Sequence, residues 1–208
     1  MKSLRTILSI VSRLHLAGWM IALVLPLTAS TVMPLDFEAL SQRASSVIGG
    51  RITNIESEKD ASTGYIYSTI TVAVTQAVPA ELAGREYTFR MLGGEVGGDN
   101  LQISDFPRLA VDQSVVLFLQ GETASVFGPT VGLWQGVFFV ESDIAAGRET
   151  VTDHLRRPVL GVRDRELVRG FNRARSGPGR SLSAGDAPEG LGMSEFFEQI
   201  RQHRGAGR

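Results

Sequence analysis

The sequence predicts a mainly β protein: a small antiparallel barrel of five or six strands, with a short N-terminal helix and a helical C-terminal extension. Short apolar or alternating segments recur between residues 46 and 141, and turns rich in glycine or proline separate them. The helix–strand alternation of a doubly wound parallel sheet is missing. With 208 residues, 43% of them hydrophobic, the chain is long enough for one domain with accessory segments.

Residues 1–30 have the features of a signal peptide. A basic region ends at Arg13, and the uncharged run LAGWMIALVLPL follows at residues 16–27. About 20 apolar residues are needed to cross a bilayer core, so this run is short for a permanent anchor. Small residues at 28–30 suit cleavage near position 30. We therefore expect export, with no stable membrane insertion after cleavage; an uncleaved N-terminal anchor is the alternative.

The chain has no cysteine, which excludes disulfide scaffolds, thiolate zinc sites and cysteine nucleophiles. An exported chain of this size without cysteine fits a bacterial periplasmic or secreted protein better than a eukaryotic one. The net charge of -1 hides two opposed segments: residues 31–147 have 6 basic and 14 acidic residues, whereas residues 148–208 have 12 basic and 8 acidic. One interpretation is an acidic domain with a basic tail that is folded against it or left mobile. The alternative is that the basic tail meets an anionic partner or surface.

The barrel domain is assigned to residues 31–147 and begins with a short helix at 36–44, capped by Asp36. A β-branched strand follows from residue 46, interrupted by Gly49–Gly50, a pair typical of a bulge or a tight bend. Residues 65–78 alternate apolar and polar side chains, which predicts a strand with one face inward.

The second half of the domain contains the remaining strands. A turn at 79–84 leads into the alternating segment 85–92, and the four glycines of 93–100 predict an irregular loop. Residues 114–120 are apolar almost throughout, as expected for a strand covered on both sides. The last two strands are expected at 126–134 and 136–141.

Residues 148–175 form an arginine-rich extension, predicted to be partly helical. Leu167, Val168 and Phe171 lie at helical spacing among the arginines of this segment. Residues 176–190 contain nine Gly, Ser or Pro in fifteen, which predicts a flexible linker.

Residues 191–208 contain a short amphipathic helix and a tail. Ser194 is the expected cap, and Phe196, Phe197 and Ile200 form the apolar side. A helix of about ten residues is marginal alone and needs a surface to dock on. We favour docking on the barrel; a partner protein is the alternative.

The order of these patterns resembles that of a group of uncharacterised exported bacterial proteins. The segments that carry the resemblance are LDFEALSQRA, SSVIGGRITNIES, YIYSTITVAVTQAVPAEL, EYTFRMLGGEVGG, FPRLAVDQSVVLFLQG and VGLWQGVFFV. The layout over residues 36–141 is also similar to the netrin/TIMP-like OB-fold domain. The resemblance implies an OB-like barrel and, because some members of the group are associated with matrixin-type metalloproteases, a secreted metalloprotease as one candidate partner.

Two departures from these families bear on function. Tissue inhibitors of metalloproteases chelate the target's zinc through an N-terminal cysteine held by disulfides, and this chain has no cysteine. Inhibition by that chemistry therefore cannot be carried over. The Lys-Gly that the bacterial group usually has before the third strand is replaced by Ala83–Gly84, which removes a charge and keeps the turn glycine.

No enzyme signature occurs in the sequence, and we expect no catalytic residue, no cofactor and no metal site. The motifs HExxH, GxSxG, SxxK and Walker A are absent. His154 follows Asp153 directly, so their side chains are expected to diverge rather than form part of a Ser-His-Asp set. Glu95 and Asp99 could form a carboxylate pair, which leaves a hydrolase as a third hypothesis.

Candidate ligand or partner contacts are glycines that could present backbone amides, two carboxylates and three aromatic side chains. They are Gly93, Gly94, Glu95, Gly97, Gly98, Asp99, Trp134, Phe196 and Phe197. The acidic barrel domain argues against nucleic-acid binding, which needs a basic surface. We predict an exported, non-enzymatic β-barrel module that acts through protein or peptide contacts; the alternative is a regulator of a secreted metalloprotease.

Overall fold

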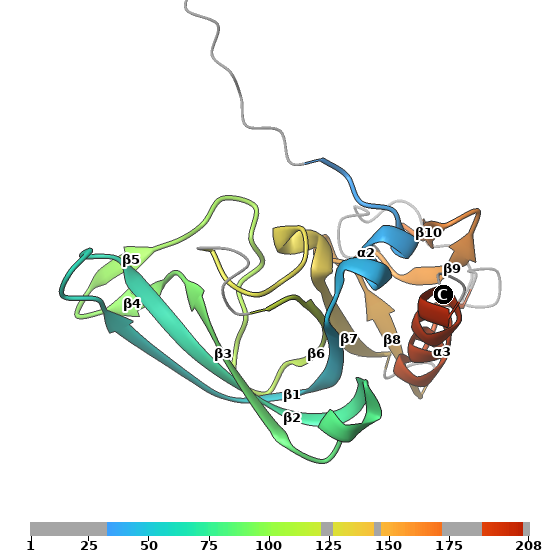
Figure 1. Ribbon diagram of the computed structural model, residues 1–208, viewed down its shortest axis with the longest axis horizontal. Coiled ribbons are helices and arrows are strands. Elements are labelled where there is room, and N and C mark those ends of the chain that lie inside the picture. Colours follow the sequence, from blue (N-terminus) through green and yellow to red (C-terminus); the bar gives the residue numbers. More distant parts are fainter. Residues whose placement is uncertain (1–32, 122–126, 144–146, 172–188, 206–208) are drawn as a thin grey trace, which may run out of the picture. The chain divides into compact units, whose positions relative to one another are not determined.

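The computed structural model describes most of the chain after residue 32 (Figure 1). The described stretches are residues 33–121, 127–143, 147–171 and 189–205. The predicted signal peptide lies outside them, as does the predicted linker apart from residues 189–190. Within these stretches, no helix has the length and apolar character needed to span a membrane.

Six antiparallel strands form the main sheet, in the order β3, β2, β1, β6, β7, β8. They are β1 (Ser46–Lys59), β2 (Ile66–Val78), β3 (Glu86–Leu92), β6 (Ser114–Leu119), β7 (Val137–Asp143) and β8 (Arg148–Thr152). Two ribbons pair β4 (Gly94–Val96) with β5 (Asp99–Leu101), and β9 (Val159–Arg163) with β10 (Glu166–Arg169). The helices are α2 (Phe37–Arg43), α3 (Met193–Gly205) and the short 3₁₀ turns η1 (Ala80–Leu82) and η2 (Leu133–Gly136).

These elements confirm the predicted mainly β class with an N-terminal and a C-terminal helix. The sheet itself is open, because no ladder joins β3 to β8 in the described residues. A short segment nevertheless lies between β3 and β6: the N–H of Leu92 donates to the carbonyl of Phe127 at 3.1 Å, and the N–H of Val131 donates to the carbonyl of Phe118 at 2.9 Å.

The helix α2 is fixed at its start by two separate parts of the chain. The Asp36 carboxylate accepts the N–H of Ala39 at 2.6 Å, which confirms the expected cap. The N–H of Phe37, also left without a partner inside the helix, donates to the carbonyl of Arg165 at 2.8 Å. The N-terminal helix is thereby joined to the C-terminal extension.

The Gly49–Gly50 pair produces the predicted bulge in β1, where the register against β2 shifts. A Cβ on Gly50 would lie 2.1 Å from the carbonyl oxygen of Ala73, so a side chain at this position would push the two strands apart. A Cβ on Gly49 would lie 2.6 Å from a ring carbon of Phe197. One glycine therefore lets the strands approach, and the other makes room for α3.

Both faces of the central strands are buried, as predicted for residues 114–120. Val116 and Phe118 of β6 pack in one cluster, together with residues of α2, α3 and the β9–β10 ribbon. Val115, Leu117 and Leu119 pack in a second cluster with Phe89 and other side chains of β1, β2, β3 and β7. The first cluster is covered by the helices and the β9–β10 ribbon. The second is enclosed by the strands of the sheet itself.

The helix α3 supplies the cover, which confirms the docking predicted for it. Phe196, Phe197 and Ile200 are fully buried. The Phe196 ring lies 5.1 Å from the Phe138 ring and 5.5 Å from the Phe37 ring, centroid to centroid. Aromatic pairs at these separations add to the free energy gained from burial alone.

Ser194 is not the cap of α3, because the helix already begins at Met193. The N–H of Gly192 instead donates to the carboxylate of Glu195 at 2.9 Å. The Ser194 hydroxyl accepts a hydrogen bond from the Gln76 side chain of β2 at 2.8 Å, so it joins the helix to the sheet.

The strand predicted at 126–134 is wrong: its described residues form a turn, an isolated bridge at Thr130 and the start of η2. Two further predictions of local structure are also wrong, and both fail at two-residue turns with positive φ. The described part of the arginine-rich extension is not helical: Asp164 and Arg165, with φ of 50° and 71°, join β9 to β10. The segment 93–100 is not an irregular loop, because Gly97 and Gly98, with φ of 59° and 91°, join β4 to β5. Such turns match the twist of paired strands and so favour hairpins.

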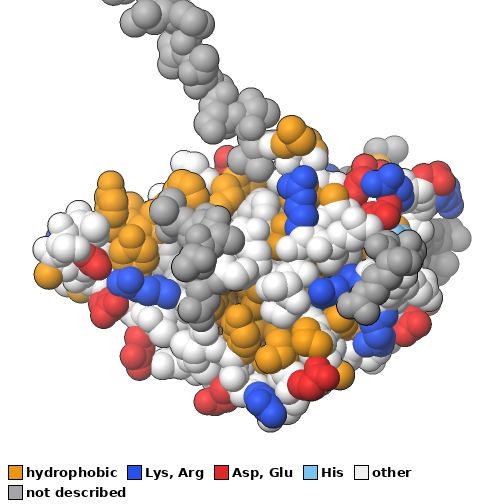
Figure 2. All heavy atoms as spheres, in the orientation of Figure 1, with side chains coloured by type: hydrophobic (Ala, Val, Ile, Leu, Met, Phe, Trp, Pro, Cys, Tyr) orange, Lys and Arg blue, Asp and Glu red, His pale blue; other side chains and the backbone are white. Residues whose placement is uncertain are grey.

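The arginine-rich extension folds against the acidic domain. Arg165 pairs with Asp36 at 3.3 Å and also with Glu38, and Arg156 pairs with Glu141 at 2.8 Å. Basic and acidic side chains lie next to each other over the region of β10 in Figure 2. The opposed charges of the two segments therefore meet within the molecule.

We expect Phe196→Ala to lower the free energy of unfolding by about 3–5 kcal/mol, because it removes a fully buried aromatic ring from the cover of the sheet. Urea denaturation followed by circular dichroism measures this loss. Glu198→Ala, on the exposed side of the same helix, is the matched control and should change stability by less than about 0.5 kcal/mol. Equal effects of the two substitutions would contradict the docking of α3.

Candidate functional site

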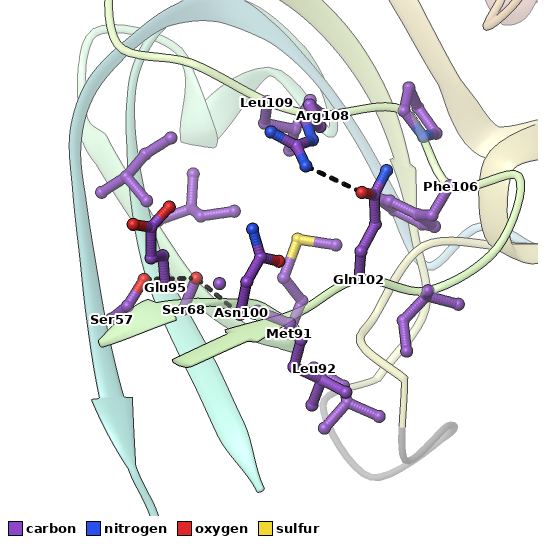
Figure 3. A pocket seen from close by; sticks show the side chains of 17 residues that line it. Ser57, Ser68, Met91, Leu92, Glu95, Asn100, Gln102, Phe106, Arg108 and Leu109 are labelled. Carbon is purple, nitrogen blue, oxygen red and sulfur yellow. Dashed lines mark hydrogen bonds between the residues drawn. The ribbon is translucent and has the colours of Figure 1, made fainter. Parts of the chain in front are cut away.

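A cavity of about 200 Å³ lies between the β4–β5 ribbon, the neighbouring ends of β1, β2 and β3, and the segment that follows β5 (Figure 3). Its apolar lining includes Ile55, Ile70, Met91, Phe106 and Leu109. Ile70 and Met91 belong to the buried core, whereas Phe106 and Leu109 pack against that core from the loop. The cavity is therefore an apolar opening into the inner face of the sheet.

The size of the cavity limits what it can hold. Pockets for drug-sized ligands have volumes of roughly 300–1,000 Å³. An apolar cavity of about 150 Å³ takes a molecule the size of benzene. At about 200 Å³, this cavity suits one aromatic or aliphatic side chain rather than a whole cofactor.

Two serine hydroxyls line one wall of the cavity. The Ser68 hydroxyl donates to the carbonyl of Gly93 at 2.7 Å, and the Ser57 and Ser68 hydroxyls lie 2.9 Å apart. Because a hydroxyl has one proton, Ser57 must donate to Ser68, and the Ser57 oxygen keeps its acceptor capacity for a ligand.

Gly94 allows the β4–β5 ribbon to lie on these serines. A Cβ at this position would come within 2.4 Å of the Ser68 oxygen and 2.5 Å of the Ser57 oxygen, and φ is 137°. Only glycine fits both the backbone conformation and the space. The predicted contact residues Gly93 and Gly94 thus shape the pocket through their backbone.

Two charged side chains lie at the pocket, one on each side in Figure 3. Glu95 comes from the β4–β5 ribbon, where it lies opposite Asn100. Arg108 comes from the loop, and its guanidinium donates to the side-chain carbonyl of Gln102 at 2.8 Å.

The other predicted residues of the ribbon do not line the pocket. Gly97 and Gly98 form the turn, and no atom lies within 4 Å of a Cβ built on either. Asp99 forms an ion pair with Lys59 at 2.6 Å, and this hydrogen bond and charge lower the pKa of Asp99. Glu95 and Asp99 are therefore not a carboxylate pair that shares one site.

The predicted aromatic contacts lie elsewhere in the fold. Phe196 and Phe197 are side chains of α3 that are fully buried in the core, so they offer no surface to a partner in this fold. Trp134 lies in η2, with its ring 6.4 Å from the His154 ring.

Sequence reasoning missed Ser57, Ser68 and the loop residues Gln102 to Leu109 as parts of a site. These residues follow no motif, because their proximity depends on how the β4–β5 ribbon folds back on β1 and β2.

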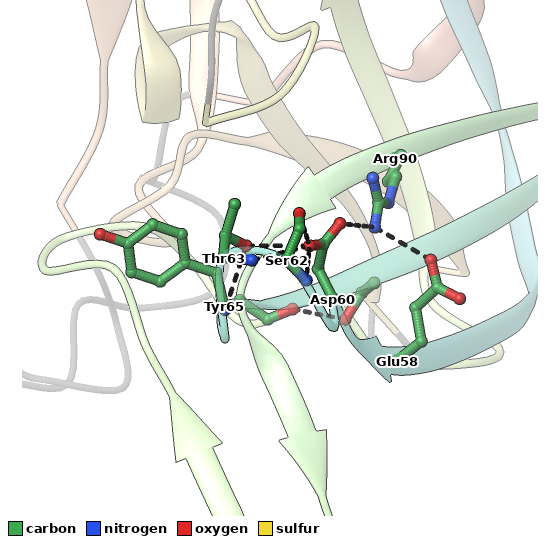
Figure 4. Close-up of polar contacts among 8 residues, drawn as sticks. Glu58, Asp60, Ser62, Thr63, Tyr65 and Arg90 are labelled. Carbon is green, nitrogen blue, oxygen red and sulfur yellow. Dashed lines mark hydrogen bonds and ion pairs between the residues drawn. The ribbon is translucent and has the colours of Figure 1, made fainter.

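The turn between β1 and β2 is fixed by Asp60 (Figure 4). Its carboxylate accepts the hydroxyl of Ser62 at 2.6 Å and the N–H groups of Thr63 and Ser62 at 3.0 and 2.9 Å. These bonds lower the pKa of Asp60 to about 2. Arg90 of β3 extends the network through an ion pair with Glu58 at 2.9 Å.

A second polar cluster surrounds Asp153, whose side chain is 3% exposed. The carboxylate accepts the N–H groups of Leu155 and Arg157, at 3.0 and 2.9 Å, and pairs with the guanidinium groups of Arg157 and Arg169, at 2.7 and 3.1 Å. These bonds tie the β8–β9 connection to β10, so the cluster is structural.

In the described residues, no hydrogen bond joins His154 to Asp153, whose carboxylate is paired with Arg157 and Arg169. Burial lowers the pKa of His154 below its ordinary value and outweighs the opposite effect of the Asp153 charge. His154 packs beside Trp134, and His203 packs beside Phe37. Neither histidine is among the residues that line the pocket.

Comparisons of the chain with protein-family models, with curated proteins and with solved structures give no match.

Asp153→Asn is expected to lower the free energy of unfolding by about 2–4 kcal/mol, because two partly buried guanidinium groups lose their counter-charge. Thermal and urea denaturation measure the change. Asp164→Asn, in the exposed β9–β10 turn, is the control and should leave both midpoints nearly unchanged. A wild-type midpoint for Asp153→Asn would show that the cluster does not hold this part of the fold.

Proposed function

We propose that the protein is an exported, non-enzymatic binding module that takes one apolar side chain of a protein or peptide partner into the pocket between β1, β2 and the β4–β5 ribbon. The observation that carries this proposal is the apolar cavity of about 200 Å³ with charged residues on either side of it. Its volume matches a single side chain, and its polar residues can contact the backbone of the segment that presents that side chain.

The chemistry at the pocket favours binding over catalysis. The Ser57 and Ser68 hydroxyls are joined to each other and to a backbone carbonyl, and no histidine lines the pocket to take a proton from either. Glu95 has no second carboxylate beside it, since Asp99 is paired with Lys59 outside the pocket. The carboxylate-dependent hydrolase is therefore the least supported of the three hypotheses.

We further propose that the sheet is an OB-like barrel. The hydrogen bonds of Leu92 with Phe127, and of Val131 with Phe118, support this because a short segment connects β3 to β6, two strands that no ladder joins directly in the described residues. A secreted metalloprotease remains one candidate partner through the resemblance of the strand order. Such a partner would be held by side-chain docking, because the chain has no cysteine to chelate its zinc.

Export is proposed from residues 1–30, with a basic region, a 12-residue uncharged run and small residues before position 31. N-terminal sequencing of the protein produced in a Gram-negative host is expected to begin near residue 31, with the protein recovered from the periplasm or the medium. An intact N-terminus on a cytoplasmic protein would contradict export without affecting the proposal for the pocket.

Asn100→Phe tests the pocket, because a ring placed on this exposed, pocket-lining residue competes for the cavity. We expect peptides selected on the wild-type chain from a random display library to bind Asn100→Phe at least about tenfold more weakly, as measured by fluorescence polarisation. Asn54→Phe places the same ring on an exposed part of β1 outside the pocket and should bind normally. Equal binding by all three chains would overturn the proposed site.

A further inference from the structure

We propose that the partner segment carries a basic and an acidic residue on opposite sides of its apolar residue, the basic one paired with Glu95 and the acidic one with Arg108. This inference rests on the proposed function, because it specifies the chemistry of the partner that the same pocket takes. It is carried by two charges at the pocket that no residue in the described part of the chain pairs with.

Glu95 has no counter-charge within the described residues. Neither a hydrogen bond nor an ion pair engages its carboxylate there, and the residue opposite it on β5 is Asn100, a neutral amide. Neighbouring carboxylates differ: Asp99 pairs with Lys59 at 2.6 Å, and Glu58 pairs with Arg90 at 2.9 Å.

Arg108 is held in place by a neutral group. Its Nη2 donates to the side-chain carbonyl of Gln102 at 2.8 Å, which orients the guanidinium and leaves its positive charge unneutralised. One of its five N–H donors is used in this bond, so a planar fork of donors remains for a carboxylate.

The two charges lie on different walls of the pocket. Figure 3 shows Glu95 on the side of the β4–β5 ribbon and Arg108 on the side of the loop that follows it, and no ion pair joins them. A segment that places an apolar side chain in the cavity would pass both. An uncharged segment would remove water from both charges without replacing it, which disfavours such partners.

The test is selection of random peptides on the full-length wild-type chain, on Glu95→Gln and on Arg108→Gln. Wild-type selections are expected to show an apolar residue flanked by Lys or Arg on one side and Asp or Glu on the other. Glu95→Gln should lose only the preference for the basic residue, and Arg108→Gln only that for the acidic residue. Glu86→Gln and Arg85→Gln, outside the pocket, are the matched controls and should select as the wild type does.

A synthetic peptide from the wild-type selection gives the second readout. Replacing its basic residue by Gln should weaken binding to the wild-type chain about two- to fivefold and leave binding to Glu95→Gln unchanged. The inference would be overturned if all chains selected peptides with the same charge preferences. It would also be overturned if the Gln-substituted peptide lost the same affinity for the wild-type chain and for Glu95→Gln. Selected peptides that share an apolar residue and bind Asn100→Phe weakly, but show no charge preference, would overturn this inference alone. Failure to select any peptide with such an apolar residue would overturn the proposed function.

Discussion

Burial of both faces of the central strands is the constraint on which the rest of the structure depends. The side chains of β6 alternate between two clusters, and neither cluster can be exposed to water without loss of the fold. Curvature of the sheet encloses one cluster. The other is enclosed by α2, α3 and the β9–β10 ribbon, which come from opposite ends of the described chain. Gly49 makes this possible, because any side chain there would displace Phe197.

Two polar clusters have different consequences because they differ in how fully their charges are compensated. Asp153 is surrounded by two guanidinium groups and two backbone amides, so it fixes the β8–β9 connection and has no capacity left for a ligand. In the described residues, Glu95 lies opposite the neutral Asn100, and Arg108 donates to the neutral Gln102; both line an apolar cavity and form no ion pair with each other. The paired charge of Asp153 therefore favours a structural role. The unpaired charges of Glu95 and Arg108 favour a role in recognising a partner.

The sequence could predict the elements whose pattern is local. The cap of Asp36, the alternation of residues 65–78 and the continuous apolar run of 114–120 each depend on near neighbours, and the structure confirms all three. The β9–β10 hairpin could not be predicted in this way, because its turn uses Asp164 and Arg165 at positive φ, where glycine is usual. Of the pocket, the sequence indicated Gly93, Gly94 and Glu95. The serines and Arg108 could not be added, since four segments must fold together before they meet.

The cluster that α3 covers also constrains the order of events during synthesis. It includes Phe37 near the beginning of the described chain and Ile200 near its end. Contacts over such a separation in sequence cannot form until residue 200 has been made, and they form slowly because a long loop must close. The face of the sheet that carries this cluster therefore stays without the cover of α3 until then.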